Sequence, residues 1–367
     1  MKYLRELTDL DGVKVLMRLD LNVPVREGRV CDDFRMRKVL PTIKFLQDKK
    51  AKIILISHIE AAGGNKKDKP SLEPVCEHFK KLGIECVFVK EYKDALQTIE
   101  NVTPGQVILL ENLRMHEGET KNDKKFAQEL ASLADLYVNE AFAVSHRAHA
   151  SVSAITEFIP SYGGLLLEQE VKHLSSAFNP DRPFLFILGG AKFETKLPLF
   201  EKFMGIADKV FVGGALANNF LKEQGVDVGT SLVSEEHFNL GRFSNNPKLL
   251  LPVDHISKDG AIFDAGPQTL ELLKSAIAEA KYILWNGPLG AYEMGYKEPT
   301  LELARMIALA TKNGAKSILG GGDTLGAIGE LGIEDQYTFV STGGGAMLEF
   351  LAQGTLPAID ALENSHA

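Results

Sequence analysis

The feature that most constrains the fold is an alternation, repeated along the whole chain, of short apolar runs and longer amphipathic segments. The apolar runs are rich in Val, Ile, Leu and Phe, which is typical of strands buried on both faces of a parallel sheet. These runs lie at residues 13–19, 52–57, 86–89, 106–110, 136–139, 184–188, 209–212, 282–285, 317–319 and 338–341. The segments expected to be helical lie at 34–49, 71–82, 123–134, 215–224, 267–280 and 299–312. The pattern predicts an α/β protein whose parallel sheets are covered by helices.

The length of the chain, 367 residues, and its two successive sets of strands and helices predict two doubly wound, Rossmann-like domains. The seam is expected near residues 163–183. There Leu166, Val171 and Leu174 fit a helix that the sequence NPDRP at 179–183 would end. From the residues alone, this helix is either a rigid connector or a surface helix of one domain.

Charge and cysteine content exclude several classes of function. The net charge is −8. The excess of acidic over basic residues lies in residues 179–367, which contain 15 Lys+Arg and 23 Asp+Glu. Neither half is a basic domain of the kind that binds nucleic acid, and no apolar run is long enough to span a membrane. The 3 cysteines form no CxxC pair, and the N-terminal segment lacks the apolar core of a secretory signal. We therefore expect a cytoplasmic protein that binds neither nucleic acid nor membrane.

Glycines concentrate in the second half, where residues 184–367 hold 24 of the 33 in the chain. Many of them follow predicted strands directly, in the loops ILGGAK (187–192), FVGGA (211–215), WNGPLG (285–290), ILGGGDT (318–324) and VSTGGG (340–345). A single such loop is explained by tight packing of a turn. Together the loops predict a phosphate-binding edge, because glycine lets backbone N–H groups approach an anion at the carboxyl ends of parallel strands.

Charged side chains in these loops suit nucleotide phosphates. Lys192 and Lys196 are expected to share one helix face, where they either contact phosphate or are solvated. Asp323 is a candidate Mg²⁺ ligand, because Mg²⁺ is commonly held by one or two carboxylates together with phosphate oxygens. Its alternative role is a helix N-cap, which is compatible with the first. The sequence contains neither a GxxxxGK[ST] loop nor a kinase-type GxGxxG motif.

Basic side chains occupy the corresponding positions of the first half. Arg18 ends the first predicted strand, His58 and Arg114 follow later ones, Arg147 lies in NEAFAVSHRAHAS, and Arg35 lies in the first turn of a predicted helix. A surface ion pair explains each of them alone. Together they predict a pocket for a small molecule with two anionic groups, because guanidinium groups match carboxylate and phosphate.

These motifs, in their order, resemble those of the phosphoglycerate kinase family over nearly the whole chain. RLDLNVP (18–24) is similar to the family's RxDxNVP signature. The other motifs are ENLRMH (111–116), HRAHAS (146–151), ILGGAK (187–192), WNGPLGAYE (285–293), GGGDT (320–324) and STGGGA (341–346). The resemblance implies a hinge-bending enzyme of glycolysis and gluconeogenesis. It would transfer a phosphoryl group reversibly between 1,3-bisphosphoglycerate and ADP, giving 3-phosphoglycerate and ATP.

The resemblance also implies an organisation of the chain. The triose-phosphate substrate domain would span residues 1–160, an interdomain helix 161–178 and a nucleotide-binding domain 179–349. The tail, about 350–367, would pack on the first domain. The protein is expected to be a cytoplasmic monomer that uses Mg²⁺ with ATP or ADP.

Functional residues follow from the same resemblance. The substrate-binding positions are Asp20, Asn22, Arg35, His58, Arg114 and Arg147. The nucleotide-binding positions are Gly190, Lys192, Lys196, Gly213, Asn286, Pro288, Glu293, Gly321, Gly322, Asp323 and Thr324, with Glu293 on the ribose and Asp323 on the metal. The catalytic positions are Arg35, Lys196 and Gly344. Arg35 would stabilise the phosphoryl group in flight, and Gly344 belongs to a helix start that would receive it.

The sequence departs from the family pattern in the first half. The family's SHLGRP reads SHIEAA at 57–62, so Ala61 stands where a substrate-binding arginine is usual, and Glu60 adds a negative charge. Losing one charge-assisted contact would weaken substrate binding by about 1.5–3 kcal/mol. A lysine of GGNKKDK (63–69) would either compensate or be solvated. Further departures, most of them conservative, are Glu140, Ala143, Ala215 and KFETK at 192–196.

The main hypothesis is an active phosphoglycerate kinase. One alternative is a divergent kinase of the same fold with weakened triose binding or a different acyl phosphate. Another is a non-catalytic nucleotide-binding protein, against which stands the joint presence of Arg35, Lys196 and Asp323. A nicotinamide-dependent oxidoreductase is disfavoured because no GxGxxG motif follows the first strand.

Overall fold

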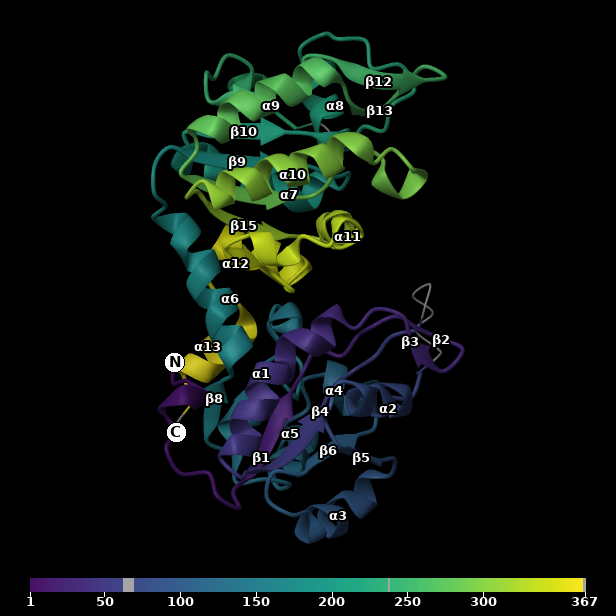
Figure 1. Cartoon of the computed structure of the whole chain (residues 1–367), viewed down its shortest axis with the longest axis vertical. Coiled ribbons are helices and arrows are strands. Elements are labelled where there is room, and N and C mark those ends of the chain that lie inside the picture. The colour runs from purple at the N-terminus through teal and green to yellow at the C-terminus, as the bar shows by residue number, and fades with distance from the viewer. Residues whose placement is uncertain (62–68, 237, 366–367) are drawn as a thin grey trace. The chain divides into compact units, whose positions relative to one another are not determined.

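The computed structural model describes residues 1–61, 69–236 and 238–365. The chain divides into two compact units, the first comprising Met1–Val171 and Thr355–Ala367 and the second Lys172–Gly354. Within the described residues each unit contains one six-stranded sheet in which all neighbouring strands are parallel (Figure 1). The prediction of an α/β fold with two doubly wound parallel sheets is confirmed.

The sheet of the first unit has the strand order β5-β6-β4-β1-β7-β8. Its strands are β1 Lys14–Arg18, β4 Lys52–Ile56, β5 Cys86–Val89, β6 Val107–Leu110, β7 Leu136–Asn139 and β8 Ser161–Gly163. Successive residues of β1 face opposite sides, because side chains alternate along a strand. Val15 and Met17 join one apolar core, and Leu16 joins the other. Both faces of this sheet are therefore covered, which explains the near-continuous apolar runs.

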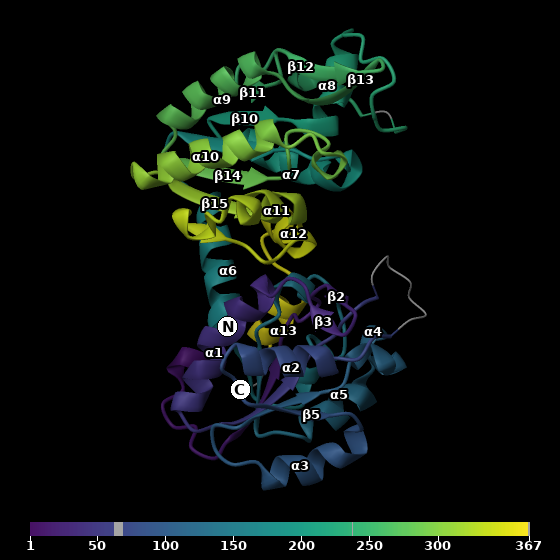
Figure 2. The ribbon, with the colours of Figure 1, turned by 45° about the vertical axis from the view of Figure 1, so that its right-hand side comes forward.

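Most helices of the first unit contribute residues to the two cores. The helices are α1 Phe34–Asp48, α2 Glu73–Lys81, α3 Ala95–Asn101, α4 Glu117–Thr120, α5 Lys124–Ala131, α6 Leu165–Ser175 and α13 Pro357–Glu363. Helix α6 begins in the first unit, and its residues from Lys172 onward belong to the second. Helices α1 and α2 contribute residues to the first core, and α5 contributes to the second. Figure 2 labels these three helices on the ribbon. Helix α13, which lies near the end of the chain, packs against β8. A short hairpin of β2 Val25–Arg26 and β3 Arg29–Val30 follows β1.

Helix α6 begins at a buried carboxylate. Glu140, which follows β7, accepts hydrogen bonds from the N–H groups of Leu166 at 3.0 Å and Leu167 at 3.2 Å, and from the hydroxyl of Thr42. Burial raises the pKa of Glu140 to about 7. Gly164 is required beside it, because a side chain there would collide with the carboxylate. Glu140 therefore satisfies donors at the start of α6 that would otherwise be unpaired in the interior.

We expect Glu140→Ala to lower the free energy of unfolding by about 2–4 kcal/mol, because it leaves several buried donors without an acceptor. Urea unfolding followed by circular dichroism measures this change. Glu140→Gln, which keeps one acceptor oxygen, should lose less. Equal stability of the wild type and Glu140→Ala would contradict this role.

The sheet of the second unit has the order β11-β10-β9-β14-β15-β16. Its strands are β9 Phe184–Leu188, β10 Lys209–Val212, β11 Leu249–Leu250, β14 Tyr282–Asn286, β15 Lys316–Gly320 and β16 Phe339–Val340. Every residue of β9 and β14 is buried, as in a sheet covered on both faces. Since the strands are parallel, the glycine-rich loops that follow them leave the same edge of the sheet.

The helices of this unit are α7 Phe193–Ile206, α8 Gly214–Glu223, α9 Pro267–Glu279, α10 Glu298–Lys312, α11 Gly322–Leu331 and α12 Gly345–Gln353. Helix α9 packs against α10, and α7 packs against α12. An antiparallel hairpin of β12 His255–Lys258 and β13 Ala261–Ala265 contacts α8. In the described part of the chain, no helix combines the length and apolarity needed to cross a membrane.

Candidate active site

The first unit places most of its predicted substrate residues after the carboxyl ends of its strands, and Arg35 in helix α1. Asp20 and Asn22 follow β1, and His58 follows β4. The Asp20 carboxylate accepts from Arg35 Nη1 at 2.6 Å, and the same nitrogen lies 3.3 Å from the Asn22 carbonyl oxygen. Arg35 therefore reaches from the first turn of α1 to the β1 loop, where one third of its side chain is exposed.

His58 is buried, and its protonation state follows from its neighbours. Burial, followed by the positive charges of Arg18 and Arg114, holds its pKa well below the usual value. The imidazole is therefore neutral near pH 7. Arg18 Nη2 lies 3.2 Å from His58 Nδ1, and because a guanidinium group can only donate, Nδ1 must accept. The ring proton is consequently on Nε2, which lies 4.0 Å from Glu60 Oε1.

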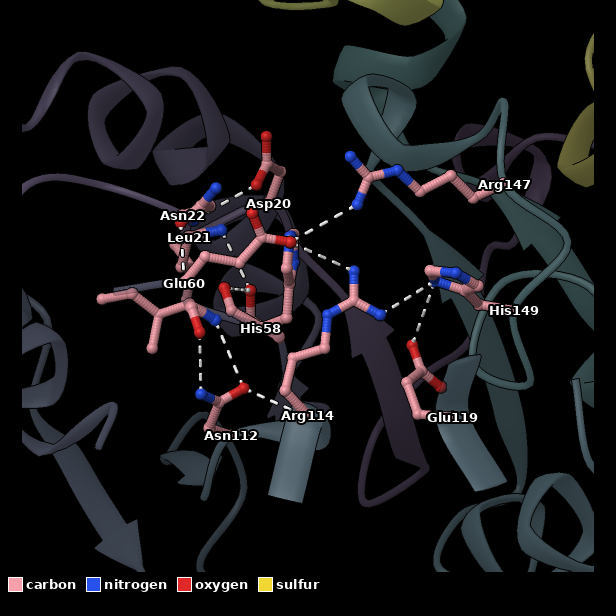
Figure 3. Close-up of polar contacts among 12 residues, drawn as sticks. Asp20, Leu21, Asn22, His58, Glu60, Asn112, Arg114, Glu119, Arg147 and His149 are labelled. Atoms are coloured by element: carbon pink, nitrogen blue, oxygen red, sulfur yellow. Dashed lines mark hydrogen bonds and ion pairs between the residues drawn. The ribbon is translucent and has the colours of Figure 1, made fainter. Parts of the chain in front are cut away.

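Two further arginines complete this group. Arg114 lies in the 3₁₀ turn Leu113–Met115 after β6, and Arg147 follows the 3₁₀ turn Phe142–Val144 after β7. Both point toward the carboxylate of Glu60, as Figure 3 shows. We call the three arginines Arg35, Arg114 and Arg147, together with the neutral His58 beside them, the cationic cluster.

A buried network holds this cluster from behind. Arg18 is fully buried, and its Nε donates to Ser151 Oγ at 2.9 Å, which in turn donates to Glu119 at 2.7 Å. Arg114 Nη1 donates to His149 Nδ1 at 3.2 Å, and burial lowers the pKa of His149 to about 3. His149 is therefore neutral and acts as an acceptor that orients Arg114.

In the second unit the glycine-rich edge borders a cavity of about 470 Å³. Four predicted nucleotide residues line it, namely Gly190, Pro288, Glu293 and Asp323. Much of the rest of its wall comes from α8 and the β12–β13 hairpin, including Ala215, Leu221 and Phe263. A mostly apolar cavity with a few polar groups is typical of a small-molecule site.

The glycines have two roles at this edge. Gly190 N donates to the Pro288 carbonyl oxygen at 3.0 Å, and Gly213 N donates to the Leu188 carbonyl oxygen at 2.9 Å. These two N–H groups are therefore used inside the protein. A side chain at Gly189 would collide with Pro288, so glycine there permits close packing of the loops after β9 and β14. Tight packing of turns therefore explains some of the glycines that follow the strands.

Other glycines of the pattern lie at the N-termini of helices. Helix α11 begins at Gly322 with Gly321 as its N-cap, and Gly321 has a φ of 111°, which favours glycine. Asp323 lies in the first turn, so the alternative that Asp323 is the N-cap is wrong. Gly344, with a φ of 52°, is the N-cap of α12. Both helix starts carry N–H groups suited to an anion.

Lys196 and Lys192 differ in their surroundings. Helix α7 begins at Phe193, so Lys192 precedes it and is exposed, and the expectation that the two lysines share a helix face is wrong. Lys196 Nζ donates to the Gly189 carbonyl oxygen at 2.5 Å. Burial lowers the pKa of Lys196 to about 8, while Asp323 favours its charged form.

Asn286 and Thr324 are buried behind the loops. Asn286 Nδ2 donates to the Gly320 carbonyl oxygen at 2.7 Å, and the Thr324 hydroxyl accepts from Gly287 N at 2.9 Å. Neither residue lines the cavity, so in this structure both support the glycine loops.

Asp323 could hold a metal ion only with help from a ligand. Among the described residues no three His, Cys, Asp or Glu side chains are grouped as a metal site. Asp323 is part-exposed at the cavity, and a single carboxylate fits Mg²⁺ that is also bound by nucleotide phosphates.

Comparison with known proteins identifies the family of the chain. The model of the phosphoglycerate kinase family matches residues 4–354. The chain belongs to the phosphoglycerate kinase family.

Its relatives cover nearly the whole chain. A phosphoglycerate kinase of Thermosipho africanus is 41% identical over 97% of this chain and 96% of the relative. The structure of phosphoglycerate kinase from Coxiella burnetii superposes with a TM-score of 0.83 at 36% identity, over 98% of both chains. That of phosphoglycerate kinase from Pyrococcus horikoshii superposes with a TM-score of 0.86 at 29% identity, over 100% of this chain and 99% of the other.

The structure brings to the site several residues that the phosphoglycerate kinase motifs did not lead us to predict there. Ser151 and Glu119 lie in or near recognised motifs, but no spacing signal links them to Arg18, which is 133 positions from Ser151. Glu60 is a departure from the family pattern that the sequence reveals, but its contacts with Arg114, Arg147 and His58 were not expected. The lysines at 66 and 67 lie outside the described residues, and Lys69 is exposed.

Proposed function

We propose that the chain is a phosphoglycerate kinase that transfers the γ-phosphoryl group of ATP reversibly to the carboxylate of 3-phosphoglycerate. A carboxylate oxygen of the triose attacks the γ-phosphorus, the new O–P bond forms as the bond to ADP breaks, and the products are 1,3-bisphosphoglycerate and ADP. The single observation that best supports the substrate is the convergence of Arg114, Arg147 and neutral His58 on one anionic oxygen.

In this proposal the first unit binds the triose. Arg114 and Arg147 neutralise its anionic groups, while His58 donates from Nε2 and Asn22 contributes its amide. Asp20 keeps Arg35 extended, since the 2.6 Å ion pair fixes one arm of the guanidinium group. The other nitrogens of Arg35 are proposed to stabilise the phosphoryl group in flight, where positioning and charge neutralisation carry most of the catalysis.

The second unit is proposed to bind the nucleotide at its cavity. The purine would lie against the apolar wall and the ribose near Glu293. The phosphates would lie near the glycine loops, the N-terminus of α11 and the ammonium group of Lys196. Mg²⁺, when bound by Asp323 and the phosphates, would neutralise charge on the nucleotide. The helix start at Gly344 offers N–H groups to the transferring phosphate.

Further parts of the proposal come from the family. We propose a substrate domain at 1–160, a connecting helix at 161–178 and a nucleotide domain at 179–349, with hinge bending that brings the two ligands together. The tail, about 350–367, would belong with the substrate domain. We also propose that the enzyme acts in glycolysis and gluconeogenesis as a Mg²⁺-dependent cytoplasmic monomer.

Steady-state kinetics with 3-phosphoglycerate and MgATP test this proposal. Turnover that saturates with both substrates is expected. Absence of turnover together with normal MgATP binding would contradict it and favour a non-catalytic nucleotide-binding protein.

A divergent kinase with altered triose binding is the second candidate, because Ala61 provides no cation beside the cluster. If the triose is the substrate, Ala61→Arg should add a charge-assisted contact and lower the KM for 3-phosphoglycerate about tenfold. The KM for MgATP should be unchanged, which serves as the internal control. An unchanged KM for the triose in Ala61→Arg would favour a different acyl phosphate as the substrate.

A further inference from the structure

The cationic cluster of the first unit holds one of the chain's own carboxylates. Glu60 Oε1 lies 3.5 Å from Arg114 Nη2, 3.5 Å from Arg147 Nη1 and 4.0 Å from His58 Nε2 (Figure 3). One oxygen atom therefore meets three basic side chains that are proposed to bind the triose. A carboxylate in this position takes the place of an anionic group of a ligand.

The main chain directs Glu60 to this position. Glu60 N donates to Asn22 Oδ1 at 3.0 Å. The preceding residue, Ile59, is held by Asn112, whose Nδ2 donates to the Ile59 carbonyl oxygen at 2.8 Å. Asn112 Oδ1 also accepts from Arg114 N at 3.0 Å. The same side chains that place the substrate loops thus place Glu60 among them.

The contacts of the Glu60 side chain are weak enough for it to leave. They are 3.5–4.0 Å long, and 48% of the side chain is exposed. Exposed ion pairs contribute at most about 1 kcal/mol each. His58 is neutral and contributes only a long contact. The side chain can therefore rotate into solvent while its backbone stays bound to Asn22.

Binding of an anion to the cationic cluster affects the ion pairs of Glu60. If Glu60 stays, two negative charges lie close together, and if Glu60 leaves, its ion pairs with Arg114 and Arg147 are lost. Either way the free energy of anion binding is less favourable than in a site with a neutral residue at this position. Ala61 offers no charge that could pair with the displaced carboxylate.

We infer that Glu60 competes with the anionic substrate for the cationic cluster and thereby sets the affinity of the first unit for it. The identity of that substrate rests on the proposed function, whereas the competition itself rests only on the described contacts. Glu60 is thus a specificity-determining residue, since it disfavours ligands in proportion to the negative charge that they bring to Arg114 and Arg147.

Glu60→Gln, which removes the charge and keeps the shape, tests this inference by calorimetric titration. Two probes are used separately, 3-phosphoglycerate and inorganic sulfate. The Kd of the variant should be about fivefold lower for 3-phosphoglycerate, and lower also for sulfate, because a competing exposed charge has been removed. The KM for 3-phosphoglycerate should fall equally, and that for MgATP should stay constant. Glu60→Gly, which removes the whole side chain, should shift binding in the same direction.

Glu157→Gln is the matched control. Glu157 is also about half exposed and pairs with Lys124, which is outside the cluster. Glu157→Gln removes one negative charge from the first unit, as Glu60→Gln does. It should leave the affinities for 3-phosphoglycerate and for sulfate unchanged. Anion affinities that are equal in the wild type, Glu60→Gln and Glu60→Gly, or weaker in the variants, would overturn the inference. If sulfate binding tightens in Glu60→Gln but the wild type does not turn over 3-phosphoglycerate, the competition holds and the proposed function fails.

Discussion

Replacement of Arg35 by Ala is expected to lower kcat at least about a thousandfold, as for other arginines that stabilise a phosphoryl group in transfer. The affinity for MgADP should not change, because Arg35 lies in the first unit and contacts Asp20 and the Asn22 carbonyl. Stopped-flow or coupled kinetics measure the rate, and calorimetry measures nucleotide binding. Unchanged kcat in Arg35→Ala would refute the proposed role.

Two variants on the same helix sharpen this test. Arg35→Lys keeps the charge and loses the planar fork, so it should recover only part of the rate. Arg37 lies on α1 as well, but it is exposed and pairs with Asp33 at 2.8 Å. Arg37→Ala should therefore retain wild-type activity, and a comparable loss in it would point to damage of the helix.

Replacement of Lys196 by Met is expected to lower kcat about a hundredfold, the size of effect seen when one preorganised donor to the transition state is lost. The wild type offers a second readout, because the pKa of Lys196 is lowered by burial to about 8. As the pH rises through this value the ammonium group loses its proton and its attraction for phosphate. The kcat/KM for MgATP should therefore decline above about pH 8 in the wild type.

In Lys196→Met this decline should be absent, since no ammonium group remains to titrate. Lys209 provides the control, because it pairs with Glu279 at 2.7 Å on the surface of the same unit. Lys209→Met should keep both the rate and the pH profile of the wild type. A decline above pH 8 that persists in Lys196→Met would assign the titration to another group.

The α/β architecture could be predicted from the sequence because buried parallel strands leave an unusually clear pattern. The runs FLFIL and YILW correspond to β9 and β14, and helix expectations such as 267–280 differ from the observed bounds by one or two residues at most ends. Short strands such as β8 and β11 and the hairpins β2–β3 and β12–β13 were not predicted. Strands of two or three residues contain too few positions for a periodic signal.

The candidate site was predictable where a motif fixes local backbone. The roles of Asp323 and Gly344 could be predicted because both lie in glycine-rich loops after strands. That of Arg35 could be predicted because it lies at the start of a helix. Contacts between distant side chains were not predictable in this way. The Arg18–Ser151–Glu119 network depends on how loops after different strands meet, and the approach of Glu60 to Arg114 depends on hydrogen bonds of Asn22 and Asn112.

Lys192 illustrates the remaining difficulty. Its spacing from Lys196 is that of neighbours on a helix, but α7 begins one residue later, at Phe193. Helix ends depend on caps and tertiary contacts that a spacing rule does not include. The same spacing therefore describes one part-buried lysine inside α7 and one exposed lysine before the helix begins.

Trapping of the acyl phosphate is the most direct test of the central claim. The protein is incubated with MgATP, 3-phosphoglycerate and hydroxylamine, which converts an acyl phosphate into a stable hydroxamate. The account predicts that one equivalent of hydroxamate forms for each ADP released, and that none forms without the triose. Release of ADP without hydroxamate, or no reaction at all, would contradict it.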